Sequence, residues 1–336
     1  MKNYCVYGFG SLGKKVVDVI LKNNDSVAII FDQKPSLTKY KGIEITPIDK
    51  LDNISIYGDI TFVIAIWNPY VNLVEIKEKL HLLGIKNCLF AGELTNLYRF
   101  EHFLFISRNE LHDNKNQIDQ VASMFEDEKS KSLFKNLLEL RKNNNYIDLP
   151  QIDSNQYFAK DIQEIINIKW NEQVYFDLGA YTGDTLVELE KYSKGNVKYY
   201  YGVEPDDNNA DTLQSTLEKL KIEGEVLRVA SGKADGLVFF EQGAGVSSRI
   251  VLGNELNSKS VPLVCFDNFL FKHTPTIIKM DIEGAEKDTL YGLENIITQN
   301  RPILMVCLYH TKDDLWKIPL YLRSLVSDYK FYLRQH

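Results

Sequence analysis

The chain has 336 residues, a length that favours about two domains. Apolar residues make up 44% and charged residues 25%, as in an ordinary soluble globular protein. The net charge of −7 provides no overall basic field, so we expect neither nucleic acid nor an anionic lipid surface as a partner.

The apolar runs and the cysteines indicate a reducing, aqueous compartment. The longest unbroken apolar run, residues 303–309, is far shorter than the roughly 20 residues that a transmembrane helix needs. Gly8 and Gly10 interrupt any signal-peptide core. The four cysteines stand far apart, without CxxC or zinc-ligand spacing, which indicates buried, reduced thiols. We therefore expect a cytoplasmic protein without a membrane span.

The first 92 residues alternate strand and helix patterns. Strands are predicted at 4–8, 27–32, 61–67 and 86–90, and helices at 12–23 and 71–84. Continuous β-rich runs separated by helices indicate a parallel sheet that is covered on both faces. We assign residues 1–98 to a Rossmann-like, mononucleotide-binding-like domain.

The middle of the chain changes character. Residues 99–160 carry two amphipathic stripes, one from Ile118 to Phe125 and one from Leu133 to Arg141, and such stripes must be buried. We therefore predict a helical bridge there. Residues 161–336 alternate again, with strands predicted at 174–178, 199–204, 225–229, 277–281 and 303–308. The predicted fold class is α/β, with two Rossmann-like parallel-sheet domains joined by the bridge.

A complete G-x-G-x-x-G motif, formed by Gly8, Gly10 and Gly13, lies between the first strand and the first helix. Asp32 ends the next strand, at the position that hydrogen-bonds a ribose in dinucleotide sites. Loop amides and a helix N-terminus can hold a phosphate, but glycines can also serve only a tight turn. Three interpretations stay open: an NAD site, a nucleotide or nucleotide-sugar site, and a structural turn.

Residues 31–51 favour the second interpretation. They resemble the nucleotide-sugar-binding amino-terminal domain of bacterial sugar acyltransferases, with an acidic residue after the second strand, a lysine-bearing loop and a G-x-x-I-x-P stretch from Gly42 to Pro47. The resemblance implies that Gly8, Gly10, Gly13 and Asp32 bind substrate. The short unit and the lack of a hydride-transfer dyad argue against NAD.

The second glycine loop, "VYFDLGAYTGDT" at 174–185, has a carboxylate, Asp177, at the end of its strand. A dinucleotide loop presents amides to phosphate, whereas S-adenosylmethionine has no phosphate and carries a sulfonium and an ammonium group. A carboxylate suits those cations. Glu204 closes the next strand, where it can accept bonds from both ribose hydroxyls. Thr185 or Asp184 can cap the helix that follows.

Further motifs follow in order: Glu204-Pro205, Ser247-Ser248, Asp267 and the segment Lys279-x-Asp281-x-Glu283-Gly284-Ala285-Glu286. Together with the loop at 177–185 they resemble the FkbM family of S-adenosylmethionine-dependent methyltransferases over about residues 155–336. The resemblance implies a class I methyltransferase domain at 161–336. Two departures are Tyr181, in place of the middle loop glycine, and the stretch CLYH from Cys307 to His310, where many members end strand five with Glu-x-His. The implied cofactor-binding residues are Asp177, Gly179, Ala180, Gly183, Asp184, Thr185, Glu204 and Ser231.

The resemblance also implies methyl transfer to an oxygen, less often a nitrogen, of a small or glycan-type acceptor. Carboxyl ends of parallel strands gather ligands, so Asp281 and Glu283 are candidate catalytic residues, as is His310, with Glu286 binding substrate. The alternatives are purely structural roles, in which Asp281 caps a helix, Glu286 makes a surface ion pair and His310 is a packed residue of the interior. No His/Asp cluster at ligand spacing requires a metal.

The sequence therefore predicts an S-adenosylmethionine-dependent O-methyltransferase of a sugar or glycan, acting on a surface polysaccharide or in a nucleotide-sugar pathway. Two alternatives are a nicotinamide-dependent oxidoreductase of sugar nucleotides using Gly8–Gly13, and a non-catalytic nucleotide-binding protein. A homo-oligomer is left open.

Overall fold

The computed structural model describes residues 1–50, 60–66, 68, 71–100, 105–143, 157–241, 250–251 and 258–335. The chain divides into two compact units, Met1–Asp119 with Ser132–Pro150, and Gln120–Lys131 with Gln151–His336. The predicted bridge at 99–160 thus contributes residues to both units. The division into three parts at 98 and 160 stays a prediction.

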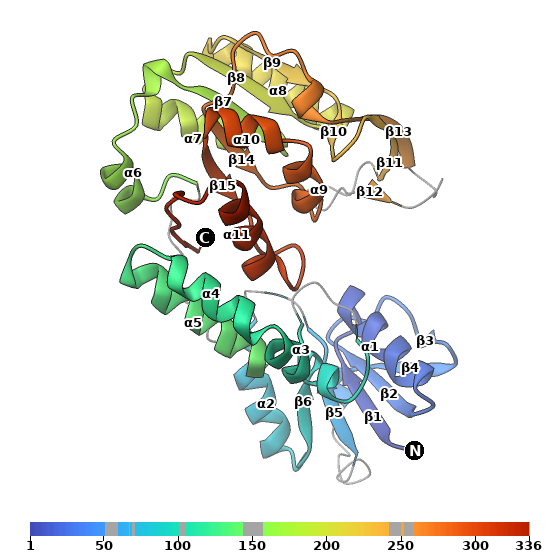
Figure 1. Ribbon diagram of the computed structural model, residues 1–336. Coiled ribbons are helices and arrows are strands. Elements are labelled where there is room, and N and C mark those ends of the chain that lie inside the picture. Colours follow the sequence, from blue (N-terminus) through green and yellow to red (C-terminus); the bar gives the residue numbers. More distant parts are fainter. Residues whose placement is uncertain are drawn as a thin grey trace. The chain divides into compact units, whose positions relative to one another are not determined.

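The first unit is built on a six-stranded sheet of order β3-β4-β2-β1-β5-β6 (Figure 1). Its strands are β1 (Asn3–Tyr7), β2 (Ser26–Asp32), β3 (Lys39–Tyr40), β4 (Ile43–Pro47), β5 (Thr61–Ile64) and β6 (Cys88–Phe90). All neighbours pair in parallel except β3 and β4. The hairpin of β3 and β4 was not predicted, because two- and five-residue strands in a polar loop leave little periodicity.

Helices cover both faces of this sheet, as alternating side chains require. α1 (Ser11–Lys22) buries Val16, Val17 and Ile20 against one face, together with Val6 of β1. On the other face Cys5 and Phe62 share a core with Leu80 of α2 (Leu73–Leu82). A 3-10 helix, η1 (Ile48–Lys50), follows β4, and η3 (Ala91–Asn96) follows β6.

Three helices occupy the predicted bridge: α3 (Arg108–Asp113), α4 (Lys115–Met124) and α5 (Glu128–Asn143). The predicted stripes are confirmed, since Val121 and Phe134 are almost completely buried. Within the described ranges, no helix is both long and apolar enough to cross a membrane.

The second unit contains a five-stranded, all-parallel sheet of order β15-β14-β7-β8-β9. Its strands are β7 (Val174–Leu178), β8 (Tyr199–Val203), β9 (Gly224–Leu227), β14 (Ile277–Met280) and β15 (Ile303–Val306). The chain builds outward from β7 to β9 and then returns to place β14 on the other side of β7. The switch point therefore lies between β7 and β14, at whose carboxyl ends open α/β sheets bind ligands.

The helices of the second unit cover this sheet on both sides. Tyr175 and Tyr200 face α7 (Asp184–Ser193) and α8 (Asp207–Leu220), in a core that includes Leu186 and Leu213. The neighbouring residue Phe176 packs on the opposite side, in the core that contains residues of α9 (Glu286–Tyr291), α10 (Glu294–Asn300) and α11 (Asp314–Leu325). α6 (Lys160–Ile166) and η4 (Trp170–Glu172) precede β7.

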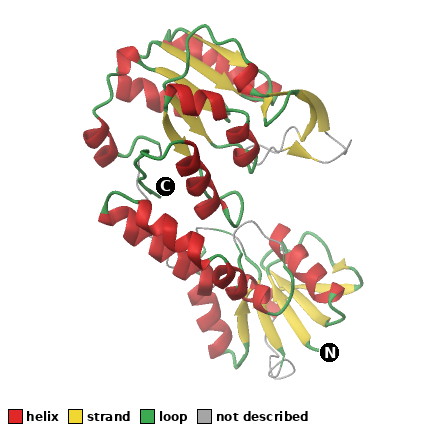
Figure 2. Cartoon of the chain, viewed as in Figure 1, coloured by secondary structure: helices red, strands yellow, loops and turns green. Residues whose placement is uncertain are grey.

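A smaller four-stranded sheet, of order β10-β13-β11-β12, lies in sequence between β9 and β14 (Figure 2). Its strands are β10 (Ala230–Ser231), β11 (Gly236–Glu241), β12 (Ile250–Val251) and β13 (Ser258–Val264). β11 and β13 pair antiparallel from Gly236–Leu263 to Glu241–Ser258. This sheet was not predicted. η6 (Phe266–Asn268) then leads towards β14.

Candidate active site

The second glycine loop is shaped by contact with the end of β14. Gly179 and Gly183 have φ values of +78° and +91°, which side-chain-bearing residues rarely adopt. A Cβ on Gly179 would lie 1.9 Å from the carbonyl oxygen of Asp281. Gly183 is the N-cap of α7 and no side chain caps this helix, so the expected cap by Thr185 or Asp184 is wrong.

Glu204 fastens this loop to the end of β8. Its side chain is buried; Oε2 accepts the Tyr181 amide at 3.0 Å, and Oε1 accepts the Asp206 amide at 2.9 Å. Burial raises the pKa of Glu204. The buried Ala180 adds a backbone bond to Val203. A carboxylate oxygen has two acceptor positions, so Glu204 keeps capacity for a further donor.

Asp177 lies fully buried under the loop. Its Oδ1 is 3.0 Å from Nζ of Lys279, and its Oδ2 accepts the Tyr200 hydroxyl at 2.8 Å. Lys279 also donates to the carbonyl of Gly179 at 2.7 Å. Burial lowers the pKa of Lys279, but Asp177 and then Asp281 outweigh it and hold the ammonium charged. The negative charge of Asp177 is thus matched inside the protein.

Asp281, the residue after β14, holds the centre of a polar cluster. Its amide donates to Leu178 of β7 at 3.1 Å, which places the side chain at the switch point. Oδ2 accepts the Tyr157 hydroxyl at 2.6 Å, and Oδ1 accepts the Tyr309 hydroxyl at 3.1 Å. Burial raises the pKa of Asp281, but Lys279 and these hydroxyls lower it overall. These contacts favour the charged form of Asp281, and the N-cap of α9 is Ala285, so Asp281 does not cap this helix.

His310 and Glu286 form a buried pair beside Asp281. Nδ1 of His310 lies 2.7 Å from Oε1 of Glu286, and the same oxygen accepts the Ile282 amide at 3.0 Å. Only 6% of the His310 side chain and 1% of Glu286 are exposed, so the surface ion pair considered for Glu286 is wrong. Burial lowers the pKa of His310, but the bond from Glu286 outweighs it and the pKa is raised.

Nε2 of His310 faces two carboxylates. It lies 3.3 Å from Oδ1 of Asp281 and 3.9 Å from Oε1 of Glu283, whose side chain is 42% exposed. Glu283 takes the left-handed conformation, with φ +54°, in the turn before α9. The structure thus brings together all the residues predicted for catalysis, and adds Tyr157 and Tyr309. Tyr309 was overlooked, because an aromatic after a strand carries no distinctive spacing.

The other predicted residues of this unit lie at different places. The Ser231 hydroxyl is buried in β10 and is 2.8 Å from that of Thr289. Asp267 accepts the Asn295 and Ile296 amides and so caps the first turn of α10. Ser247 and Ser248 lie outside the described residues.

The first glycine loop is also held by an acidic side chain that accepts backbone amides. Asp32 accepts the Phe9 amide on Oδ2 at 2.7 Å and the Lys34 amide on Oδ1 at 2.9 Å. A Cβ on Gly13 would lie 2.0 Å from the carbonyl oxygen of Gly8, so these two glycines are required for close packing. A Cβ on Gly10 would meet nothing within 4 Å. The fold therefore places no demand on Gly10.

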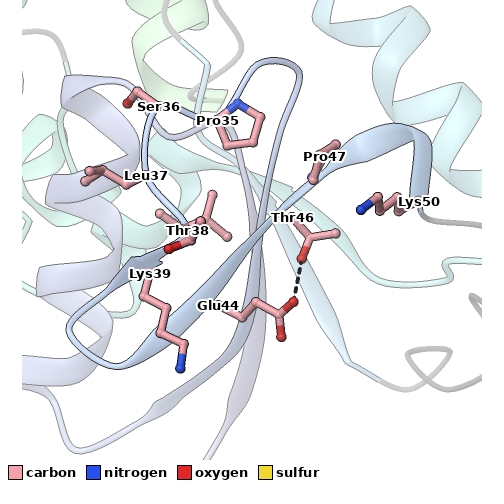
Figure 3. Close-up of a pocket in the computed structure, with 10 residues that line it drawn as sticks. Pro35, Ser36, Leu37, Thr38, Lys39, Glu44, Thr46, Pro47 and Lys50 are labelled. Carbon is pink, nitrogen blue, oxygen red and sulfur yellow. Dashed lines mark hydrogen bonds between the residues drawn. The ribbon is translucent and has the colours of Figure 1, made fainter.

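A pocket of about 470 Å³ lies in the first unit between the segment after β2 and strand β4 (Figure 3). Lys39 and Lys50 line it with several hydroxyl groups, and Glu44 accepts the Thr46 hydroxyl across its wall at 3.2 Å. Its volume is in the range of ligand pockets, but its lining is mostly exposed.

Comparisons with known proteins identify the second unit. Residues 177–333 match the family model described as the methyltransferase FkbM domain. No curated protein matches the chain. Among solved structures, the crystal structure of methyltransferase FkbM from Methylobacillus flagellatus KT is similar, with a TM-score of 0.77 and 20% identity. That match covers 100% of this chain and 87% of the other, and it supports the class I fold. The match over residues 177–333 identifies the chain as a methyltransferase, and this part of it is similar to the FkbM domain.

Proposed function

We propose that the protein transfers a methyl group from S-adenosylmethionine to a hydroxyl of a sugar or glycan-type acceptor. The observation that supports this most directly is the cluster of Asp281, Glu283 and His310 at the switch point, beside the glycine loop that begins at Gly179. A methyltransferase implies a methyl donor of the S-adenosylmethionine type. Ligands of open α/β sheets bind at this edge.

The donor set suits a cationic cofactor. At the switch point, Asp281, Glu283 and Glu286 stand against Lys279 and His310, and Lys279 is already paired with Asp177. The excess of carboxylates favours positive charge. Gly179, Ala180, Gly183, Asp184 and Thr185 would line the loop side and Glu204 the ribose. When bound, the cofactor supplies an electrophilic methyl group. Because Asp177 is buried and paired, we assign it to holding Lys279 and the loop.

The cluster would activate the acceptor. An alcohol is a weak nucleophile until its proton is drawn away. Nε2 of His310 is the buried atom best placed to do so, and Glu286, bonded to Nδ1, fixes the orientation of the ring. Glu286 is too deeply buried to reach the acceptor itself, so we assign it as a positioning residue. As the acceptor oxygen forms its bond to the methyl carbon, the carbon–sulfur bond breaks.

We assign the first glycine loop to acceptor recognition. Gly10 is exposed and the fold does not require it, so a ligand that approaches the backbone closely is a physical reason for glycine there. A phosphate on a nucleotide-sugar would suit the loop amides. The oxidoreductase and the non-catalytic alternatives remain outcomes of the tests below.

Titration calorimetry of the full chain with S-adenosylmethionine tests the assignment. We expect Glu204→Ala to weaken binding about tenfold or more, because charge-assisted ribose bonds are lost. Asp32→Ala is the matched control, since it removes the equivalent acid of the first loop and should leave the affinity unchanged. Equal affinity of the Glu204 variant and the wild-type protein would place the ribose elsewhere. Binding of NAD in place of S-adenosylmethionine would overturn the proposed function.

A further inference from the structure

Nε2 of His310 is one of several buried side-chain atoms of the second unit that have no hydrogen-bond partner among the described residues, and it lies beside two carboxylates. Because Nδ1 faces the carboxylate of Glu286 at 2.7 Å, the ring proton belongs on Nδ1. In the neutral ring, Nε2 then carries a lone pair. Only 6% of the side chain is exposed, and Nε2 has no hydrogen-bond partner among the described residues. A buried polar atom without a partner is destabilising unless something else satisfies it.

The surroundings of this lone pair are negative. The nearest oxygens are Oδ1 of Asp281 at 3.3 Å and Oε1 of Glu283 at 3.9 Å. A lone pair directed at carboxylate oxygens is repelled by them unless a positive charge lies between. A small divalent cation binds each ligand atom at about 2.1 Å. Two ligand atoms are then roughly 3.0 Å apart if the angle at the cation is 90°, and about 4.2 Å apart if they lie on opposite sides of it. The two observed distances fall between these limits.

The contacts of the other ring nitrogen of His310 are also typical of a metal site. A histidine that binds a metal usually donates its other ring N–H to a carboxylate, which fixes the ring and increases its basicity. Glu286 takes this position, and its Oε1 is held in turn by the Ile282 amide. The ligand atoms of Asp281, Glu286 and His310 all lie within 4.8 Å of one another.

We propose that Nε2 of His310 and Oδ1 of Asp281 bind one divalent cation, with the carboxylate of Glu283 completing the set from the exposed side and Glu286 orienting the imidazole. One imidazole with two carboxylates suits a first-row cation such as Mn²⁺ better than Ca²⁺. The sequence showed no metal-ligand spacing, because the histidine and the acids come from different strands.

The role of the cation rests on the proposed function. Bound at Nε2, it would polarise the acceptor hydroxyl and lower its pKa. With the cation bound, Nε2 of His310 would serve as a ligand and no longer as the proton acceptor, so the hydroxyl proton would pass to the carboxylate of Glu283. The binding of the metal, however, is measurable without cofactor or acceptor.

The test is titration of the EDTA-treated full chain with Mn²⁺, followed by calorimetry and by electron paramagnetic resonance. We expect one equivalent of Mn²⁺ per chain. Glu286→Gln should weaken binding about 10–100-fold, the range for a lost outer carboxylate, and His310→Ala should abolish it. His112→Ala is the matched control, since it removes an exposed imidazole 3.6 Å from Asp113 and should change nothing.

Nitrogen coupling in pulsed resonance of the wild-type protein keeps the test valid if the histidine variant fails to fold. A bound imidazole couples to Mn²⁺, and its absence would overturn the proposal. So would unchanged Mn²⁺ affinity in folded His310→Ala. Full methyl transfer in EDTA would reject the catalytic role of the metal and leave the proposed function intact. Failure of S-adenosylmethionine to bind would reject the proposed function and leave the metal titration valid.

Discussion

The two glycine loops of this chain share one construction and differ in what stands beside them. In each, an acid after the second strand accepts a loop amide, Asp32 from Phe9 and Glu204 from Tyr181. In each, the first glycine lies against the strand next to the loop. A Cβ on Gly8 would meet the Ala65 carbonyl oxygen at 2.8 Å, and a Cβ on Gly179 would meet that of Asp281 at 1.9 Å.

The difference lies in the residue at that meeting point. Ala65 donates its amide to Tyr7 just as Asp281 donates to Leu178, so the two residues occupy equivalent positions after β5 and β14. One is an alanine, and the other is the centre of a charged cluster. Under the proposed function, both loops would bind a ligand, and the residue that follows the neighbouring strand would determine whether a reaction takes place there.

The largest expected effect is a loss of stability when a side chain is added to a glycine that lies in close contact with the backbone. Gly179→Ala should destabilise the protein by at least about 3 kcal/mol, because the Cβ overlaps the Asp281 carbonyl and φ is positive. Gly10→Ala should stay within about 0.5 kcal/mol, since it meets no atom. Urea unfolding of both variants measures this. Similar stabilities would mean that the two loops are not packed as described.

Asp281→Ala gives the second unit the residue that the first unit has at the equivalent position. We expect turnover to fall about 10²–10⁴-fold while S-adenosylmethionine still binds. Methyl-transfer assays and calorimetry measure the two quantities. Asp281→Asn keeps the size of the side chain and should lose turnover as well, because the charge is removed. Joint loss of binding and turnover would make Asp281 a structural or cofactor-binding residue.

Gly10→Val tests whether the first loop takes part in acceptor recognition. If the first loop holds a phosphate of the acceptor, the added side chain should raise the KM for the acceptor about tenfold, equivalent to roughly 1.4 kcal/mol. The affinity for S-adenosylmethionine should not change, because we assign its binding to the second loop. Steady-state kinetics with a nucleotide-sugar acceptor measures the effect. An unchanged KM together with unchanged stability would remove the first loop from recognition.

The smallest effect concerns an ion network that belongs to the second unit. Arg334 contacts Asp127 at 2.6 Å and Asp161 at 2.8 Å. Burial raises the pKa of Asp127, but Arg334 and Ser130 outweigh it and lower the pKa to about 2. A lowered pKa stabilises the fold above pH 3.8, and this contribution is lost as the pH falls towards 2.

Arg334→Gln should therefore lower the free energy of unfolding by about 1 kcal/mol at pH 7, a figure reduced for partial exposure. The difference from the wild-type protein should shrink as the pH falls from 3.8 to about 2. Lys142→Gln, which removes an exposed helical ion pair with Glu139, is the control and should change little. A difference that is independent of pH would mean that Arg334 acts through packing.

Much of the scaffold followed from sequence patterns. Continuous apolar runs such as Ile303–Val306 predicted the parallel strands, because buried strands leave few other arrangements. The hairpin at Lys39–Pro47 and the small sheet around Gly236–Val264 were not predicted, since their strands are short or partly polar. Asp281 and His310 were also selected as candidates from the sequence, because Asp281 ends one predicted strand and His310 follows another. Their partners were not: Tyr309 and the pairing of Asp177 with Lys279 depend on contacts between distant segments.

The path of the chain has a consequence for how such a protein can be assembled from modules. Residues 120–131 belong to the second unit, although residues of the first unit precede and follow them, so the chain passes between the units three times. This short stretch carries Asp127, which binds Arg334, and Ser130, whose hydroxyl accepts the Leu333 amide at 2.8 Å. A catalytic fragment that starts at residue 151 would lack both anchors. Recombination at one breakpoint therefore cannot exchange either unit intact. A transfer of the complete second unit has to include both residues 120–131 and residues 151–336.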